Sequence, residues 1–214
     1  MAFRKIASCL ILAAAAHAAQ FPATYKKHAG FLTVDETGVS YAGAKAQNWS
    51  WKYQDIQRLT LSPDHVTVLT YEDNRHSPVG DVSYEFTGKI PAAELYDLLK
   101  GRLDQRFVAA LAEISWPVQF SIAAKHLLRG TFQNRGSQGA LSFGADAIAW
   151  STPNTDDSRT WRYRDIAGIS SSGPFDFTIT TLEKTFHFQL KQTLAERRYN
   201  ELWMEIEKKN GKIQ

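Results

Sequence analysis

Apolar and polar residues alternate along two stretches of the chain, 30–43 and 139–152, and a short turn interrupts each stretch, at 36–38 and at 144–146. Such alternation is typical of a strand with one buried face, so each stretch is predicted to form a β-hairpin. The two stretches also match each other at one constant spacing, which indicates an internal repeat. Gly30, Leu32, Val34, Val39 and Tyr41 correspond to Gly139, Leu141, Phe143, Ile148 and Trp150.

A second pair of segments, 51–56 and 161–166, matches more closely. Both contain Trp, Tyr, Asp and Ile at the same spacing: Trp51, Tyr53, Asp55 and Ile56 correspond to Trp161, Tyr163, Asp165 and Ile166. Residues two apart on a strand share a face, so the Trp and Tyr of each copy are expected in the core. The repeated Asp is expected to accept backbone N–H groups where one strand ends and the next begins.

The apolar period changes from two to about 3.6 at the end of each copy, which predicts a closing helix. In the first copy the helix follows Pro91 and carries a leucine stripe at 95, 98, 99 and 103, and residues 106–114 are expected to extend or follow it. In the second copy Thr193 and Glu196 have the spacing of a capping box.

Six or seven short strands followed by one packed helix resemble the pleckstrin-homology-like (PH-like) and GRAM-like superfold, over residues 27–104 and 125–209. The close doubling also resembles a family of exported bacterial proteins of unknown activity. The resemblance implies a mainly β fold with C-terminal helices (α+β), built as two tandem PH-like units. Each unit would be a strongly bent antiparallel sheet capped by one helix. A superfold implies architecture and says little about activity.

The first eighteen residues read as a secretory signal peptide. Arg4 and Lys5 precede an apolar run at 6–16, and Ala16-His17-Ala18 forms a cleavage site. The run is about half the length of a membrane span, and no later segment reaches that length. The predicted organisation is therefore a signal peptide (1–18), repeat 1 (19–104), an apolar connector (105–124) and repeat 2 (125–214). The mature protein would be periplasmic or secreted.

The connector does not have the composition of a flexible linker, which would be rich in Gly, Ser or charged residues. Its apolar side chains need a dry surface, and the two units together provide one. We therefore expect the units to pack together, with Trp116 at their interface. The apolar residues in question are Phe107, Val108, Leu111, Ile114, Trp116, Val118, Phe120 and Ile122.

Charge and composition exclude several classes of function. The 25 basic residues fall to 23, against 22 acidic ones, once Arg4 and Lys5 leave with the signal peptide. So small a net charge gives no footprint for nucleic acid. The acidic first hairpin loop at 35–38 also argues against phosphoinositide binding. Cys9 is the only cysteine, so the mature chain has no disulfide and no thiolate chemistry.

Candidate chemistry is sparse, and no cofactor or metal site is expected. None of the five later histidines forms a close ligand pair, and His28 and His126 are expected to face solvent near the start of each copy. The serines at 170–172 lack the spacing of a nucleophile elbow, which indicates a loop.

One basic cluster stands out, because Arg159, Arg162 and Arg164 flank Trp161. Arg162 and Arg164 are expected on the strand face opposite Trp161, where guanidinium groups could bind an anion or a partner. The alternative is a solvated outer face with local ion pairs to Asp156 and Asp157.

Two hypotheses of function follow. The first is an exported, non-catalytic binding or scaffold protein, whose ligand is unknown and whose partner is a protein or peptide. The second is a hydrolase-like enzyme with a site between the repeats that uses Asp, His or Arg. The two hypotheses differ in one observable: the enzyme requires polar residues that converge in a pocket between the two units.

Overall fold

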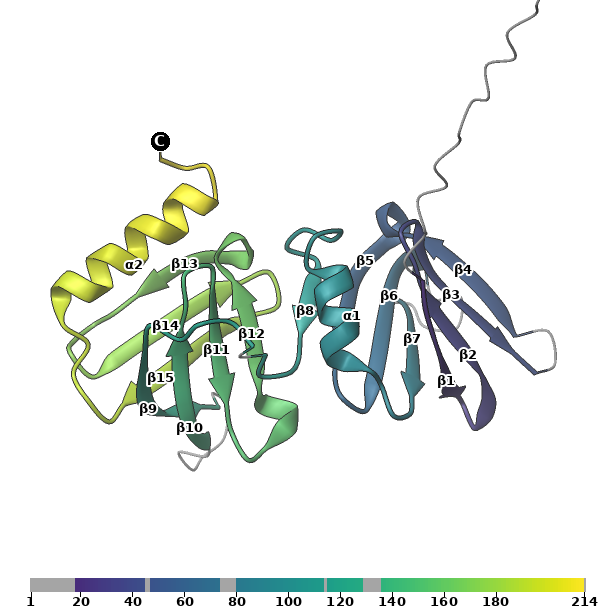
Figure 1. Cartoon of the computed structure of the whole chain (residues 1–214), viewed down its shortest axis with the longest axis horizontal. Helices are drawn as coiled ribbons and strands as arrows, with labels where there is room; N and C mark the ends of the chain where they lie inside the picture. The colour runs from purple at the N-terminus through teal and green to yellow at the C-terminus, as the bar shows by residue number, and fades with distance from the viewer. Residues whose placement is uncertain (1–17, 45–46, 74–79, 114, 129–135, 214) are drawn as a thin grey trace, which may run out of the picture.

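The computed structural model describes residues 18–44, 47–73, 80–113, 115–128 and 136–213. The fold is mainly β, with two α-helices among these residues (Figure 1). The first half contains β1 (Ala19–Tyr25), β2 (His28–Val34), β3 (Gly38–Gly43), β4 (Asn48–Lys52), β5 (Ile56–Leu61), β6 (His65–Asp73), β7 (Asp81–Thr87) and α1 (Ala92–Leu99). After β8 (Phe107–Ala109), the second half contains β9 (Phe120–Leu127), β10 (Gly136–Phe143), β11 (Ala147–Ser151), β12 (Arg159–Arg162), β13 (Ile166–Ser170), β14 (Asp176–Thr181), β15 (Thr185–Leu190) and α2 (Glu196–Lys209).

All fifteen strands belong to one hydrogen-bonded order, β13-β14-β15-β9-β10-β11-β12-β8-β5-β6-β7-β1-β2-β3-β4. The expectation of two separate sheets is therefore wrong. The order nevertheless repeats, because each half places its last three strands before its first four. Register shifts at the start of β5 and of β13 mark a bulge at the same place in each half, where added twist bends the sheet.

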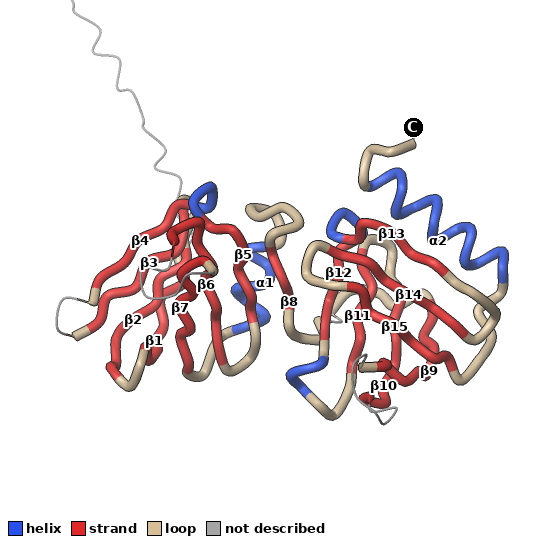
Figure 2. The backbone as a smooth tube through the Cα atoms, turned by 180° about the vertical axis from the view of Figure 1, so that it is seen from behind, coloured by secondary structure: helices blue, strands red, loops and turns tan. Residues whose placement is uncertain are grey.

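Strand β8 joins the two halves into one ladder (Figure 2). It runs parallel to β5, with Leu59 opposite Phe107, and antiparallel to β12, with Thr160 opposite Ala109. Of the two expectations for this segment, that it extends the helix or follows it, the extension is wrong: Phe107–Ala109 follows α1 as a strand. Two exposed strand edges flank this short apolar segment, and an extended backbone satisfies both of them, which a helix cannot do.

Each half has its own hydrophobic core, rich in aromatic side chains. Tyr41 and Phe86 are fully buried in the first, and Trp150 and Phe188 in the second. The connector residues Phe107, Ala109 and Leu111 belong to the first core, so β8 is part of that half by packing.

The two helices follow the predicted apolar stripes in part. Helix α1 begins after Pro91 and buries Leu95 and Leu99, and Figure 1 shows it at the junction beside β8. Helix α2 begins after Ala195, with no side-chain cap, so the predicted capping box does not form. Its Leu202 is buried, whereas Trp203 is 39% exposed and lies outside the buried stripe.

No helix in the described part of the chain is long and apolar enough to cross a membrane. The predicted signal peptide falls on residues 1–17, outside the described residues, and on Ala18. Strand β1 begins at Ala19, the residue that follows the predicted cleavage site, and Ala19 pairs with Val34 of β2.

Candidate functional site

A single 3-10 turn joins the fourth strand of each half to the fifth, and it contains the Tyr and Asp of the repeated motif, whose Trp lies on the preceding strand. The turn opens with Tyr53 in the first half and with Tyr163 in the second. Each tyrosine hydroxyl donates to a backbone carbonyl of the hairpin in its own half, Tyr53 to Asp35 and Tyr163 to Gly144, both at 2.6 Å. Burial raises the pKa of Tyr53 to about 12 and also raises the pKa of Tyr163. The two phenols therefore stay protonated and hold the turns in place.

The two tryptophans of the motif pack inside the cores. Trp51 is 6% exposed and Trp161 is 4% exposed. The ring centroid of Trp51 lies 4.7 Å from that of Tyr84, and Trp161 lies 4.8 Å from Phe186. Such aromatic pairs stabilise a core beyond the area they bury, so neither ring is a platform for a ligand.

Arg162 lies inside the molecule, paired with the Asp of its own turn. Its Nε donates to Oδ2 of Asp165 at 2.6 Å, and Nη2 donates to Oδ1 at 2.6 Å. Asp165 also accepts the backbone N–H of Arg162 at 3.3 Å. Both side chains are 9% exposed, which makes this a buried, two-pronged ion pair.

The rest of the Arg162 guanidinium reaches into the first half. Nη1 donates to the carbonyls of Lys100 and Leu103, the latter at 3.0 Å, and Nη2 donates to the carbonyl of Asp104 at 2.8 Å. An arginine has five N–H groups, and all five are used. The expectation of a solvated Arg162 is therefore wrong: the side chain lies on the predicted face of β12, opposite Trp161, but the segment after α1 covers that face.

The other two arginines of the cluster have different surroundings. Arg159 pairs with Glu183 at 3.1 and 3.3 Å, rather than with the expected Asp156 and Asp157, although Nη1 does donate to the Asp156 carbonyl. Arg164 is exposed, and none of the described residues forms an ion pair with its side chain. The three arginines therefore do not converge on one surface, and only Arg164 is free to bind.

The two repeated aspartates, Asp165 and Asp55, also differ in burial and in partners. Burial raises the pKa of Asp165, and the hydrogen bonds and positive charge of Arg162 oppose this rise. Asp55 is exposed and has no partner in the described part of the chain. The motif residue is thus a structural contact in the second half and a free carboxylate in the first.

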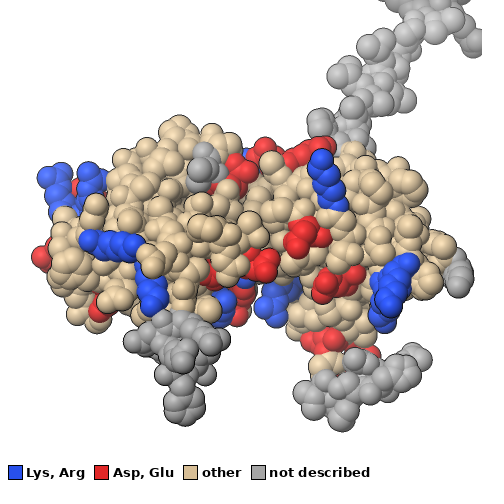
Figure 3. Space-filling model, turned by 90° about the horizontal axis from the view of Figure 1, so that it is seen from below, with Lys and Arg blue, Asp and Glu red and all other residues tan. Residues whose placement is uncertain are grey.

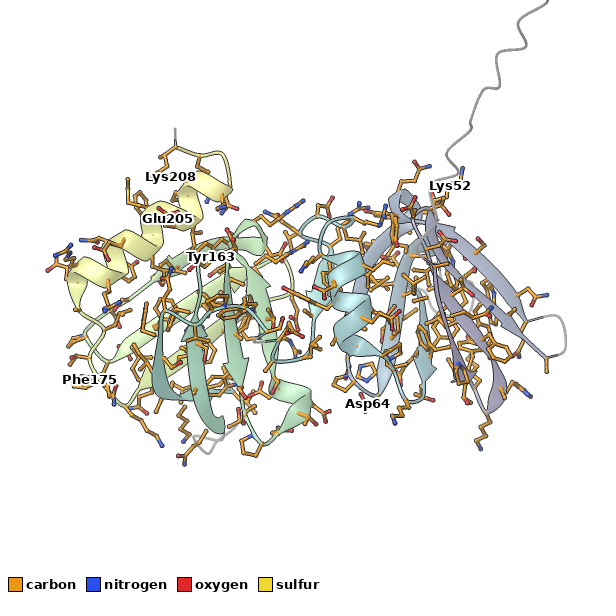
Figure 4. The ribbon with its side chains drawn as sticks, in the orientation of Figure 1. Lys52, Asp64, Tyr163, Phe175, Glu205 and Lys208 are labelled. Carbon is orange, nitrogen blue, oxygen red and sulfur yellow. The ribbon has the colours of Figure 1, made fainter. Side chains whose placement is uncertain are left out.

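A groove of about 790 Å³ lies between the two halves, within the size range of ligand pockets. Tyr96 of α1 and Lys100 just after it line the groove from the first half, Trp116 lines it from the connector, and Tyr163, Arg164 and Lys209 line it from the second half. Figure 4 places Tyr163 at the upper edge of the second half, below α2. The sequence led us to expect Trp116 between the units and singled out Arg164 as a possible partner-binding residue, but it did not indicate that the two line one groove.

The groove combines aromatic rings with basic side chains. Lys209 pairs with Asp146 at 2.7 Å, and Lys100 pairs with Asp97, whereas Arg164 keeps a free guanidinium. The indole N–H of Trp116 is buried and has no acceptor among the described residues. The exposed guanidinium of Arg164 is therefore an unused donor in this hollow, whereas the Trp116 N–H is shielded from it. On the opposite face of the molecule, shown in Figure 3, basic and acidic side chains are interspersed.

A buried polar cluster in the second half was not predicted. His126 is 2% exposed, contrary to the expected solvent-facing position, and its Nδ1 lies 2.9 Å from both carboxylate oxygens of Asp157. Ser137 donates its hydroxyl to the same carboxylate. Burial raises the pKa of Asp157, but the hydrogen bonds from His126 and Ser137 outweigh it and leave the pKa below its usual value.

The sequence does contain a signal for this cluster, because His126 continues the inward phase of Ile122 and Ala124 along β9. The cluster does not have the arrangement of a hydrolase. Asp157 lies between the serine and the histidine, whereas a nucleophilic serine must contact its base. Among the described residues, no group of three or more His, Cys, Asp or Glu side chains could hold a metal ion.

No protein-family model matches this chain, and no curated protein matches it. Solved structures match in part. They include the C-terminal domain of an unknown protein from Leishmania infantum (14% identity, 42% of this chain and 84% of that one, TM-score 0.33). The Spt16D Pob3N heterodimer (13%, 83% and 98%, 0.32) and the N-terminal PH domain of human ARAP2 (13%, 46% and 87%, 0.32) also match. Likenesses this weak say nothing about a ligand or partner of this chain.

Proposed function

We propose that this chain is an exported, non-catalytic binding protein made of two tandem PH-like units, and that the groove between the units is its binding site. The repeated strand order supports the tandem organisation, as does a helix at the end of each half. The matching tyrosine hydrogen bonds, from Tyr53 and from Tyr163, support it independently of the sequence.

The observation that carries the proposal is that the groove takes its walls from both units. Tyr96 comes from the first unit and Tyr163 from the second, so the hollow exists only while the units are held together. The free guanidinium of Arg164 favours a carboxylate, and the rings favour an apolar group beside it. We propose a peptide segment with acidic and aromatic side chains as the ligand.

Export is proposed on the signal-like sequence of residues 1–18, and the position of β1 supports it. Ala19 is 7% exposed and already paired with β2, so cleavage before it would leave the described fold intact.

The test is titration of the mature protein labelled with 5-fluorotryptophan, observed by ¹⁹F NMR. The six tryptophans give six resonances, each assigned by a Trp→Phe variant. The probe is a short peptide with alternating glutamate and phenylalanine, compared with the same peptide carrying lysine in place of glutamate. We expect the acidic peptide to shift the Trp116 resonance and the basic peptide to leave it in place.

Two variants with the same change of charge sharpen the test. Arg164→Glu should abolish the shift, whereas Lys27→Glu, at an exposed turn of the first unit, should not alter it. A Trp116 resonance that stays fixed with both peptides, or moves equally in the two variants, would remove the groove as the binding site.

A further inference from the structure

The fourth strands of the two units, β4 and β12, have equivalent outer edges, as the sheet register shows. Strand β3 pairs with β4 as β11 pairs with β12, so that Ser40 lies opposite Ser50 and Ala149 lies opposite Thr160. Ser50 is therefore the counterpart of Thr160. By the same register, Lys52 is the counterpart of Arg162.

In the second unit this edge is occupied, and it binds backbone groups. The Thr160 hydroxyl donates to the Leu111 carbonyl at 2.7 Å and accepts the Glu113 N–H at 2.7 Å. Arg162 holds the carbonyls at the end of α1, and β8 pairs with the edge of β12. A helix end and the extended segment that follows it therefore dock on this edge.

In the first unit the corresponding side chains are exposed and have no partner among the described residues. They are Ser50, Lys52 and Asp55, the counterparts of Thr160, Arg162 and Asp165. Figure 4 shows Lys52 at the upper end of the first unit. The counterparts of Thr160 and Arg162, which bind the docked backbone, and of Asp165, which holds Arg162, are thus unused in the first unit.

Strand β4 is also an unprotected end of the fifteen-strand order. The opposite end, β13, is capped by residues of α2 and the segment after it: Tyr199, Asn210 and Lys212 donate to the carbonyls of Ile169, Ile166 and Ala167. No such donor reaches β4 from the described parts of the chain. An open edge of this kind is a template for another strand.

We infer that the β4 edge is a second binding site, which takes an extended apolar segment of a partner polypeptide by strand addition. The inference rests on the tandem organisation proposed above but not on the groove. A second copy of this chain fits less well, because the counterpart of the α1 end and β8 is the segment after α2. That segment is bound to its own β13 through Asn210 and Lys212.

The chain itself provides the probe, since its own segment occupies the equivalent edge. A synthetic peptide of residues 104–113 is added to the 5-fluorotryptophan protein. We expect it to shift the resonance of Trp49, which lies on β4, and to leave Trp116 and Trp161 unchanged. The same peptide with Val108→Pro, which cannot complete a strand ladder, should cause no shift.

Protein variants then locate the site. Ser50→Ala combined with Lys52→Glu should weaken peptide binding about tenfold, the effect of losing one or two hydrogen bonds. Ser40→Ala, the same change on the neighbouring strand β3, should leave peptide binding unchanged. In each variant, the resonances of the five tryptophans other than Trp49 report whether the fold is intact.

Three outcomes would overturn the inference. Absence of any shift would do so, as would a shift confined to Trp161, which would mean exchange with β8. Self-association of the protein that Lys52→Glu abolishes would identify a second copy as the occupant. A shift of Trp49 with no response at Trp116 to the acidic peptide would support the β4 edge and reject the groove.

Discussion

The guanidinium of Arg162 donates a 3.0 Å hydrogen bond to the main-chain carbonyl of Leu103, across the boundary between the two halves of the sheet. Leu103 belongs to the buried core of the first half, and Arg162 is the last residue of β12 in the second half. The contact therefore fixes one unit against the other, and the groove that contains Tyr96 and Tyr163 depends on it.

Replacing Arg162 should destabilise the whole molecule. Arg162→Ala leaves the buried carboxylate of Asp165 and three carbonyls without their donor, and breaking a buried ion pair in this way costs about 3–5 kcal/mol. Urea denaturation of the mature protein measures the free energy of unfolding. Arg164→Ala, two residues away and exposed, should change it by less than about 0.5 kcal/mol. Equal stability of the two variants would contradict the buried position of Arg162.

Truncating a core tryptophan should have a comparable effect for a different reason. Trp161→Ala removes a ring that packs 4.8 Å from Phe186 and leaves a cavity, at a cost of about 3–5 kcal/mol. Trp203→Ala is the matched control, because Trp203 lies on the exposed side of α2. Denaturant midpoints of both variants check this, and a Trp161→Ala protein as stable as its parent would place that ring outside the core.

The Asp157 carboxylate should make stability depend on pH in the acidic range. Its pKa lies below the usual value of about 4 in the folded protein, so the folded state binds this proton less readily than the unfolded state does. The stabilisation is complete above pH 4 and is lost as the pH falls through the lower folded-state pKa. We expect Asp157→Asn to be less stable than the parent at pH 7 and to lose that difference toward pH 2. Thermal melts check this, with Asp156→Asn at the exposed neighbour as the control, which should be as stable as the parent at pH 7.

The mature protein should unfold in one cooperative transition. The core of the first half includes Phe107 and Leu111 of the connector, and β8 pairs with strands of both halves. Calorimetry should therefore show a single peak. Two separate transitions, each reproduced by a unit expressed alone, would contradict this coupling.

N-terminal sequencing of the protein from an exporting host should give Ala19 as the first residue, because the cleavage pattern ends at Ala18. Soluble cytoplasmic protein that keeps Met1 would contradict the proposed export.

The sequence predicted the mainly β character, the helix after Pro91 and the buried aromatic residues, because these depend on local periodicity. It missed β8, since Phe107, Val108 and Ala109 extend only because two strand edges, from β5 and from β12, flank them.

Arg162 and His126 were misplaced for a related reason. Arg162 lies on the predicted face of β12, but the segment after α1, about 60 residues earlier in the chain, covers that face. The inward phase of Ile122 and Ala124 along β9 does indicate the burial of His126, but its partner Asp157, 31 residues away, leaves no mark in the local pattern. The walls of the groove likewise come from segments that are far apart in the sequence.

The position of β8 also determines what a break in the chain would do. Residues 115–119 are mostly exposed, with Val118 at 44%, and they follow the segment that contacts both halves. A protease that cut beside Val118 would leave β8 with the first fragment, still paired with β12 and still covering Arg162. Once folded, the two halves would remain a non-covalent complex, so the peptide bond between them is needed to bring the units together and not to keep them there.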